Sequence, residues 1–499
     1  MERAAGVLLS ITSLPSKYGI GCFSKEAYQF VDWLKGAGQE YWQILPLGPT
    51  GFGDSPYASF STFAGNPYFI DLETLIKDGL LTEAECDQVD FGDDEQSIDY
   101  EKIYSGRYKL LRKAFERSDI NADKEYQEFV KKHSSWLEDY TLFMAVKSHY
   151  EGKPWYQWPD DIRNREAKAV EEHREKLGSE IEFQKFMQYL FFTQWFKLRA
   201  YANENGIKMI GDIPIYLAYD SSDVWANPEL FYLDEKHDPY EVAGVPPDGF
   251  SPTGQLWGNP LYKWEYHKET GYSWWAERMR SCFDLYDIVR IDHFRGFDEY
   301  YSVPFGEDTA INGKWNKGPG VEIFKEIEKK IGKRPVIAED LGYVNESLKK
   351  LVDDSGFPGM KVIEFGFDER DSGYATDYLP HNYDYNSVAY TGTHDNPTLV
   401  GWWDEITEKE QQMVRDYLGD YYTPEDKLYI PMIGAIMRSS SKLCIVQMQD
   451  YLGLDSSTRM NVPSSVGKNW RWRLQFSQLT DELQTRIKSV TELCGRLKK

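Results

Sequence analysis

Short apolar or β-branched runs alternate with segments of helical periodicity along this 499-residue chain. The runs expected to form strands are 6–12, 40–47, 207–215, 287–293, 335–341, 361–367, 387–394 and 444–450. Most of them lack strict alternation of apolar and polar residues, which is typical of parallel strands buried on both faces. Eight such strands with helices between them predict an α/β fold, a (β/α)8 TIM barrel, over residues 1–499. An open doubly wound sheet is the alternative, although no GxGxxG motif follows the first run.

The strands are unevenly spaced, and the long intervals predict insertions into the barrel. The interval 48–206 is largely helical in pattern, and residues 181–198 within it carry a broad apolar face at helical spacing. We therefore expect a largely helical insertion between the second and third strands rather than a separate domain behind a linker. The interval 235–264 is rich in glycine and proline, which predicts a loop that covers the mouth of the barrel and the substrate.

The charge balance narrows the classes of partner. Lys and Arg total 57 against 81 Asp and Glu, so the net charge is −24. Phosphate backbones and anionic lipid headgroups would repel such a chain, which argues against a nucleic-acid or membrane-surface role. The five cysteines are far apart and form no CxxC pair, so we expect reduced thiols in a cytoplasmic protein. No apolar run reaches the roughly 18 residues that a transmembrane helix needs.

Acidic side chains stand at the carboxyl ends of four expected strands, where barrel enzymes place their reactive groups. They are Asp212, Asp292, Glu339 and Asp395. A single such acid is commonly a helix cap. Four carboxylates in one barrel mouth repel each other, so their occurrence together indicates a function. Clustered carboxylates without a cysteine nucleophile suit glycosidic-bond cleavage. In that chemistry one acid protonates the leaving oxygen, and a second carboxylate attacks the anomeric carbon or activates water.

Strand geometry separates the roles of these acids. Arg290 and Asp292 are two residues apart on one strand, so their side chains share a face, and the guanidinium favours an ionised carboxylate. That environment suits a nucleophile, although an internal salt bridge that stabilises the barrel is an equally simple interpretation. Glu339 has no basic neighbour at its strand end, so burial is expected to raise its pKa, as a general acid requires. Asp340 follows it and is expected to point the opposite way.

Several ordered segments resemble known conserved regions. GDIPIY (211–216), RIDHFRGF (290–297), IAEDLG (337–342) and THDN (393–396) resemble the motifs of the α-amylase clan. SPYASFSTFAGNPYFIDL (55–72), PPDGFSPTGQLWGNPLY (246–262), RMN (459–461) and NWRWR (469–473) resemble one branch of it, glycoside hydrolase family 77. That family contains the 4-α-glucanotransferases called amylomaltase or disproportionating enzyme. The similarity extends over nearly the whole chain, so it is far more specific than any single short motif.

The resemblance implies a role for each residue that matches a family motif. Asp292 matches the nucleophile that forms a covalent glucosyl-enzyme, Glu339 matches the general acid and base, and Asp395 matches a third acid that holds sugar hydroxyls. The residues implied to bind substrate are Tyr57, Asp212, Phe250, Trp257, Arg290, His293, His394 and Asn461.

The resemblance also implies the reaction and its partners. A segment of an α-1,4-glucan or maltooligosaccharide donor passes to the 4-hydroxyl of glucose or another glucan by a retaining double displacement. Neither a metal ion nor another cofactor is expected, and neither a nucleic acid nor a membrane is an expected partner. We expect a monomer or homodimer that acts in carbohydrate metabolism in the cytoplasm.

Three other functions remain open on the residues alone. An α-amylase-like retaining hydrolase uses the same acids and differs in transferring its intermediate to water. A metal-dependent barrel hydrolase is a second alternative, because His293 and His394 beside the acids are suitable ligands for a divalent ion. The simpler interpretation is that both histidines donate hydrogen bonds to sugar or carboxylate. The third is a glucan-binding barrel without catalysis, against which the intact Asp292, Glu339 and Asp395 argue.

Overall fold

A computed structural model describes residues 3–51, 53–247, 251–342, 345–369 and 375–498. Eight strands form one sheet in the order β10-β11-β12-β1-β2-β3-β6-β9, and every neighbouring pair is parallel. Their bounds are β1 Ala4–Leu8, β2 Tyr41–Gln43, β3 Lys208–Pro214, β6 Ile288–Asp292, β9 Val336–Ala338, β10 Gly359–Val362, β11 Ser387–Tyr390 and β12 Leu443–Gln447. All eight lie within or beside the runs expected from the sequence, and the (β/α)8 fold is confirmed.

The ring closes between β9 and β10. The backbone N–H of Ala338 donates to the Pro358 carbonyl at 3.0 Å, and the Asp340 carboxylate accepts from the Met360 N–H at 2.7 Å. A Cβ on Gly359 would lie 2.5 Å from an oxygen of Asp340, so the contact requires glycine there. Asp340 therefore points into the seam between the strands and away from the barrel mouth, as strand alternation predicts.

Helices follow the barrel strands and cover the outside of the ring. They are α1 Lys25–Gly36, α9 Gly178–Glu204, α12 Ser273–Leu285, α13 Glu322–Ile331, α14 Glu346–Ser355, α15 Leu399–Glu405, α16 Glu408–Leu418, α17 Tyr429–Arg438, α18 Met448–Leu452 and α19 Asp481–Leu493. Local signals fix several of their ends. The Asn345 side chain caps the first turn of α14, and Gly356 ends that helix in the left-handed conformation.

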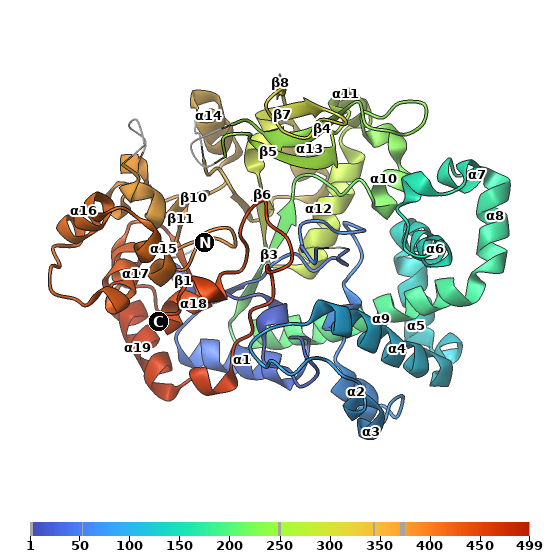
Figure 1. The fold of residues 1–499 in the computed structure, drawn as a ribbon, viewed down its shortest axis with the longest axis horizontal. Helices are drawn as coiled ribbons and strands as arrows, with labels where there is room; N and C mark the ends of the chain where they lie inside the picture. The colour runs from blue at the N-terminus through green and yellow to red at the C-terminus, as the bar shows by residue number, and fades with distance from the viewer. Residues whose placement is uncertain (1–2, 52, 248–250, 343–344, 370–374, 499) are drawn as a thin grey trace.

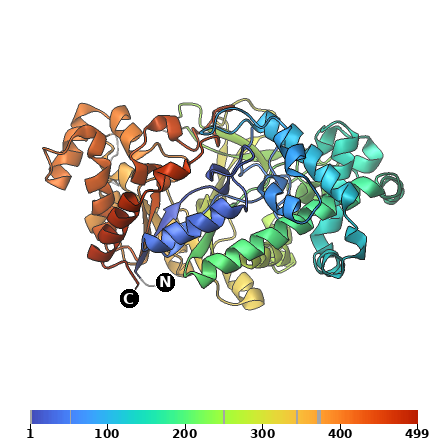
Figure 2. The ribbon, with the colours of Figure 1, turned by 90° about the horizontal axis from the view of Figure 1, so that it is seen from below.

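The interval 48–206 is mainly helical, as its sequence pattern predicts. It contains α2 Leu72–Lys77, α3 Glu83–Asp87, α4 Tyr100–Arg117, α5 Lys124–Lys132, α6 Ser134–His149, α7 Asp160–Arg163 and α8 Ala167–Lys176 and ends in the long α9. In Figure 1 these helices gather at the right of the barrel, and the C-terminal helices α15 to α19 lie at its left. Figure 2 shows the same two groups at opposite ends of an elongated molecule, with the barrel between them.

A second, antiparallel sheet lies at the top of Figure 1, in the strand order β5-β4-β7-β8. Its strands are β4 Glu241–Val245, β5 Gln255–Pro260, β7 Glu299–Pro304 and β8 Lys314–Lys317, and the short helices α10 Ser222–Ala226 and α11 Trp264–Glu269 lie nearby in the chain. The expectation of a loop over 235–264 was therefore wrong for β4 and β5. β4 pairs with β7, which comes much later in the chain, and the pairing buries a small apolar core. A local sequence pattern does not show such a partner.

Two further features concern the chain as a whole. Among the described residues, no helix has both the length and the apolar character that crossing a bilayer requires. The two ends of the chain meet, because the Arg496 guanidinium donates to the Ala4 carbonyl at 2.9 Å.

Candidate active site

One buried guanidinium organises the carboxyl ends of β3 and β6. Arg290 Nη1 lies 2.7 Å from both oxygens of Asp212, and Nη2 lies 2.9 Å from Asp292 Oδ1. The third nitrogen of the guanidinium, Nε, faces the Met360 sulfur at 3.3 Å. Burial by itself would lower the pKa of Arg290, but Asp212 and Asp292 together raise it well above its ordinary value. The guanidinium therefore stays charged and holds two carboxylates at fixed positions.

The two carboxylates on Arg290 differ in exposure, which separates their roles. The Asp212 side chain is 1% exposed, whereas that of Asp292 is 26% exposed. Arg290 and Asp292 do form the ion pair that the sequence left open, and Arg290 forms a second, fully buried pair with Asp212. Asp292 shares the same cation and keeps an open face toward the barrel mouth. That combination of a fixed position and an accessible oxygen is what a nucleophile requires.

Glu339 follows β9 and lies beside Asp292. Its Oε2 accepts from the backbone N–H of His293 at 2.6 Å, and its Oε1 accepts from that of Leu341 at 2.9 Å. Burial raises the pKa of Glu339 to about 7, and the nearby Asp292 charge acts in the same direction, while Arg290 and the two N–H groups oppose it. A carboxyl group with a pKa near 7 serves as acid and as base at neutral pH.

Asp395 stands on the turn after β11 and receives partners from two directions. Asn461 Nδ2 donates to its Oδ1 at 2.6 Å, and His394 Nε2 lies 3.2 Å from its Oδ2. Burial opposes ionisation of this carboxyl, but His394 and Asn461 outweigh it and lower the pKa of Asp395 to about 2. The third acid is therefore an anion throughout the neutral range.

Tyr57 connects Asp212, at the end of β3, with His394, on the turn after β11. Its hydroxyl donates to Asp212 Oδ2 at 2.8 Å and lies 2.8 Å from His394 Nδ1, while the two rings stack with centroids 4.2 Å apart. Because the hydroxyl proton goes to Asp212, Nδ1 must donate to Tyr57, and Nε2 faces Asp395. Burial lowers the pKa of His394, but Asp395 more than compensates and raises it. The geometry is therefore that of an imidazolium with both N–H groups used.

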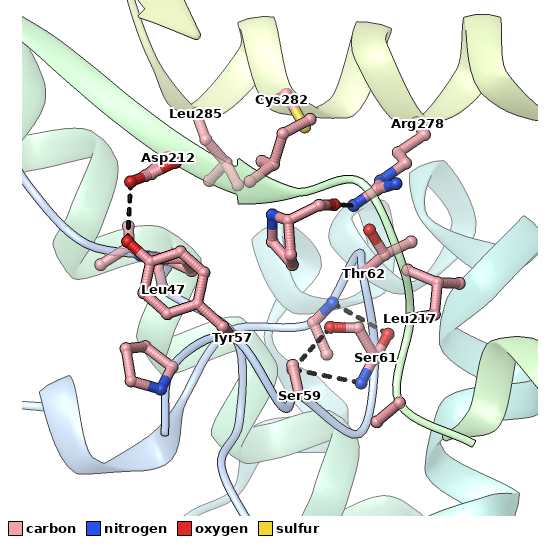
Figure 3. A pocket seen from close by; sticks show the side chains of 18 of the residues that line it. Leu47, Tyr57, Ser59, Ser61, Thr62, Asp212, Leu217, Arg278, Cys282 and Leu285 are labelled. Carbon is pink, nitrogen blue, oxygen red and sulfur yellow. Dashed lines mark hydrogen bonds between the residues drawn. The ribbon is translucent and has the colours of Figure 1, made fainter. Parts of the chain in front are cut away.

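A small cavity lies behind Tyr57 and Asp212 (Figure 3). Arg278 of α12 reaches one end of it, where it donates to the Pro214 carbonyl and, at 2.9 Å, to the Ile215 carbonyl. These bonds satisfy the backbone carbonyls just past Asp212 on β3. The end of this strand is thus held from behind by a helix as well as by the sheet.

His293 and Trp257 form an adjoining wall of the site, beside the carboxyl end of β6. His293 adopts the left-handed conformation (φ 53°), which turns the chain sharply out of β6. Its ring meets the Trp257 ring edge to face at 4.7 Å, and Trp257 is 38% exposed on β5. Burial lowers the pKa of His293 to about 3, so the imidazole is neutral, and its buried Nε2 has no hydrogen-bond partner among the described residues. It is therefore available to a ligand that lies against Trp257.

The site unites most of the residues singled out in the sequence. The residues brought together at the barrel mouth are Tyr57, Asp212, Arg290, Asp292, Glu339, His394, Asp395 and Asn461, with Trp257 and His293 on the adjoining wall. Phe250 lies outside the described residues. Within the described part of the chain, no group of three or more His, Cys, Asp or Glu side chains is arranged to hold a metal ion.

Sequence reasoning missed three residues that border the site. Trp470 lies 5.9 Å from the rings of both Tyr57 and His394, and Tyr216 lies 6.2 Å from the His293 ring. Arg459 donates to the backbone carbonyls of Asn461 and Asp395. Each occurs in a segment that the sequence marked as a motif, but nothing in the motif shows which side chain turns toward the cleft.

Comparison with known proteins gives one consistent family. The family model described as 4-alpha-glucanotransferase, glycoside hydrolase family 77, matches residues 9–480. A 4-alpha-glucanotransferase of Clostridium butyricum is 47% identical over 491 residues, which cover 98% of this chain and 100% of the relative. One from Thermus thermophilus is 44% identical over 506 residues and covers both chains completely.

Solved structures give the same result. The amylomaltase of Streptococcus agalactiae, solved in complex with acarbose, superposes with a TM-score of 0.96 at 41% identity and covers 100% of both chains. The amylomaltase of Corynebacterium glutamicum superposes with a TM-score of 0.74 over 98% of this chain and 75% of its own. At 18% identity the second likeness concerns the fold alone.

Proposed function

The chain belongs to the 4-α-glucanotransferase family, glycoside hydrolase family 77, and we propose that its transfer reaction runs through Asp292 as nucleophile and Glu339 as general acid and base. Enzymes of this family move a segment of an α-1,4-glucan to the 4-hydroxyl of an acceptor sugar. One observation carries the assignment. Asp292 is held by Arg290 with its carboxylate open to the barrel mouth, and it lies next to Glu339, whose pKa is about 7.

The first half-reaction breaks the donor. Glu339, protonated in a substantial fraction of molecules at neutral pH, donates its proton to the glycosidic oxygen while Asp292 attacks the anomeric carbon. The carbon–oxygen bond to the leaving sugar breaks, the reducing-end fragment departs with the proton, and an ester forms between the glucan and Asp292. Positive charge that develops on the sugar ring is stabilised by the carboxylates around it.

The second half-reaction builds the product. Glu339, now a carboxylate, accepts the proton of an acceptor's 4-hydroxyl as that oxygen attacks the anomeric carbon, and the ester to Asp292 breaks. Two inversions at the same carbon restore the α configuration. Because Glu339 must give a proton and then take one, a pKa near neutrality serves both steps.

The remaining polar residues bind the reacting sugar in this proposal. Asp395 is an anion that accepts from sugar hydroxyls, and His394 and Tyr57 fix its orientation and that of the sugar. Trp257 stacks on the glucan and limits access of water, which favours transfer over hydrolysis. Phe250 is assigned the same role. His293 is neutral, its Nε2 has no partner in the described part of the chain, and it binds a sugar hydroxyl beside it.

Substrates and setting complete the proposal. The donors are α-1,4-glucans and maltooligosaccharides, and the acceptors are glucose and glucans. Acarbose, present in the Streptococcus agalactiae complex, is expected to compete with them at this site. We place the enzyme in the cytoplasm, as a monomer or homodimer, because reducing conditions there keep its free cysteines as thiols.

Maltotriose alone, with products resolved by chain length, tests the proposal. Transfer gives free glucose together with a ladder of longer maltooligosaccharides, whereas an α-amylase-like hydrolase gives glucose and maltose without longer chains. Asp292→Asn is expected to abolish the ladder. A ladder of unchanged rate from that variant would overturn the assignment of the nucleophile.

A further inference from the structure

The turn that carries His394 and Asp395 is organised around one buried amide, that of Asn396, which is 8% exposed. Its Oδ1 accepts from both the backbone N–H and the hydroxyl of Thr393, each at 2.9 Å. The backbone N–H of Asp395 in turn donates to the same Thr393 hydroxyl oxygen at 3.2 Å. The oxygen of Asn396 therefore holds Thr393 in place, and the Thr393 hydroxyl in turn accepts a hydrogen bond from the backbone of Asp395.

The other end of the Asn396 amide binds an acid from the segment that follows β10. Nδ2 donates at 2.9 Å to Oε2 of Glu364, which is 4% exposed in the 3-10 helix Ile363–Phe367 after β10. The orientation of the amide is unambiguous, because the Thr393 N–H can only donate and the Glu364 oxygen lies opposite the nitrogen. One amide thus bridges the turn to Glu364, and the bridge needs an acceptor at one end and a donor at the other.

A second buried acid binds the chain just after the same turn. Asp450 of α18 is 1% exposed, and its Oδ1 accepts from the backbone N–H of Leu399, where α15 begins. Oε1 of Glu364 and Oδ2 of Asp450 are both buried with no hydrogen-bond partner among the described residues.

Burial and a neighbouring charge favour the protonated forms of these acids. Burial raises the pKa of Glu364 well above its ordinary value, and Asp450 and Glu405 act in the same direction, while Asn396 and Arg459 oppose them. Burial also raises the pKa of Asp450, to about 7. Two neighbouring buried carboxyl groups that repel one another keep a proton to higher pH than isolated carboxyl groups do.

We propose that Glu364 and Asn396 are positioning residues for glucan transfer, which hold the turn so that the Asp395 carboxylate meets the sugar with Asn461 and His394. The inference rests on the proposed role of Asp395 and adds to it a buried support that does not touch the substrate. Neither residue belongs to the set of side chains that line the cleft. Their effect on the reaction is transmitted through Thr393 and the backbone of Asp395.

A reversal of donor and acceptor tests the bridge. Asn396→Asp keeps the shape and the acceptor for Thr393 but places an oxygen opposite Glu364, so the contact survives only while a proton lies between the two carboxyl groups. We expect kcat on maltotriose to fall about tenfold at pH 8, with a smaller deficit toward pH 5.5 and little change in KM. The double variant Glu364→Gln/Asn396→Asp restores a donor, and its kcat is expected to return to within about threefold at every pH.

A second pair of variants leaves Asn396 intact. Glu364→Gln keeps an acceptor for the Asn396 amide and is expected to retain kcat, whereas Glu364→Leu removes it and is expected to lose about tenfold. Asn66→Asp is the matched control, because Asn66 is another buried amide whose oxygen caps a different turn, the 3-10 helix Pro67–Phe69. Thermal unfolding of each variant separates a loss of folded protein from a loss of turnover.

The outcomes are distinct. Wild-type kcat and pH profile in Asn396→Asp, or equal kcat in Glu364→Gln and Glu364→Leu, would overturn the proposal. So would a loss in Asn396→Asp that the double variant does not recover. Asp395→Asn, assayed in parallel, tests the premise separately: full activity there would refute the role of Asp395, whereas an inactive Asp395→Asn beside an unaffected Asn396→Asp would refute the support alone.

Discussion

The two halves of the site are built in different ways. Asp212 and Asp292 lie on neighbouring barrel strands, share the buried Arg290, and are held by the ladder that pairs Asp212 with Arg290. Asp395 stands on a turn, is 47% exposed, and depends on Asn461, which comes from a distant loop.

This contrast predicts different effects of mutation on folding and on activity in the two halves. On the strand half, Arg290 and Asp212 form a buried ion pair inside the barrel, so its loss is expected to disturb folding and activity together. On the turn half, Asp395 and Asn461 are partly exposed and meet through one side-chain hydrogen bond, so loss of that bond is expected to reduce activity and leave the fold intact.

Arg290→Met gives the largest expected effect. It leaves Asp212 buried without its cation, which is expected to lower the free energy of unfolding by about 3–5 kcal/mol and to abolish transfer. Urea unfolding and the maltotriose assay measure the two losses. Arg290→Lys keeps the positive charge but loses the paired donors of the guanidinium. Its free energy of unfolding and its transfer activity are expected to lie between those of Arg290→Met and the wild type. Unchanged stability in Arg290→Met would contradict the strand half of the comparison.

Glu339→Gln comes next and concerns activity alone. The first step needs protonated Glu339, so wild-type kcat/KM is expected to fall as pH rises through about 7, the pKa of that group. Glu339→Gln is expected to lose roughly 10²–10⁴-fold in kcat. Initial rates on maltotriose between pH 5 and 9 give both results, and a wild-type profile that is flat from pH 6 to 9 would contradict the assignment.

Asn461→Ala probes the turn half. It removes one hydrogen bond to a charged group, which is worth about 1.5 kcal/mol, so kcat/KM is expected to fall about tenfold while the melting temperature stays unchanged. Asp395 remains ionised because His394 still stabilises it. Asn386→Ala, an exposed amide at the start of β11, is the control. A large loss of stability in Asn461→Ala would remove the distinction between the halves.

Trp257→Ala gives the smallest expected effect. The Trp257 ring lies on β5 at the rim of the site, and it meets the His293 ring edge to face. Loss of a stacking surface is expected to raise the KM for maltotriose about threefold and to increase the share of donor that is hydrolysed. Trp315→Ala is a matched control, because Trp315 is 40% exposed on the same sheet and packs on Arg295. Equal effects in the two variants would show that Trp257 has no special contact with substrate.

Much of this arrangement was predictable because it depends on local periodicity. The eight barrel strands follow from alternating apolar runs and helical segments, and the shared face of Arg290 and Asp292 follows from the two-residue repeat of a strand. The opposite direction of Asp340 follows from the same repeat. These features need no knowledge of distant residues.

Other parts were not predictable from local sequence. β4 and β5 were expected as loop, since β5 pairs only with β4, and the other partner of β4, β7, lies beyond the next barrel strand. Asn461 was placed near the cleft by a motif alone, and its contact with Asp395 spans 66 residues of chain. Nothing near Glu364 in the sequence shows that it meets Asn396.

The sequence by itself determined the barrel, the acids at its strand ends and the family to which they belong. Only the tertiary structure decided which carboxyl is buried on Arg290, which one stays open, and why the pKa of Glu339 is about 7 while that of Asp395 is about 2. Side-chain direction on a strand is fixed by the residues beside it. A pKa and a hydrogen-bond partner are fixed by groups from other strands and turns, which only folding brings within a few ångströms.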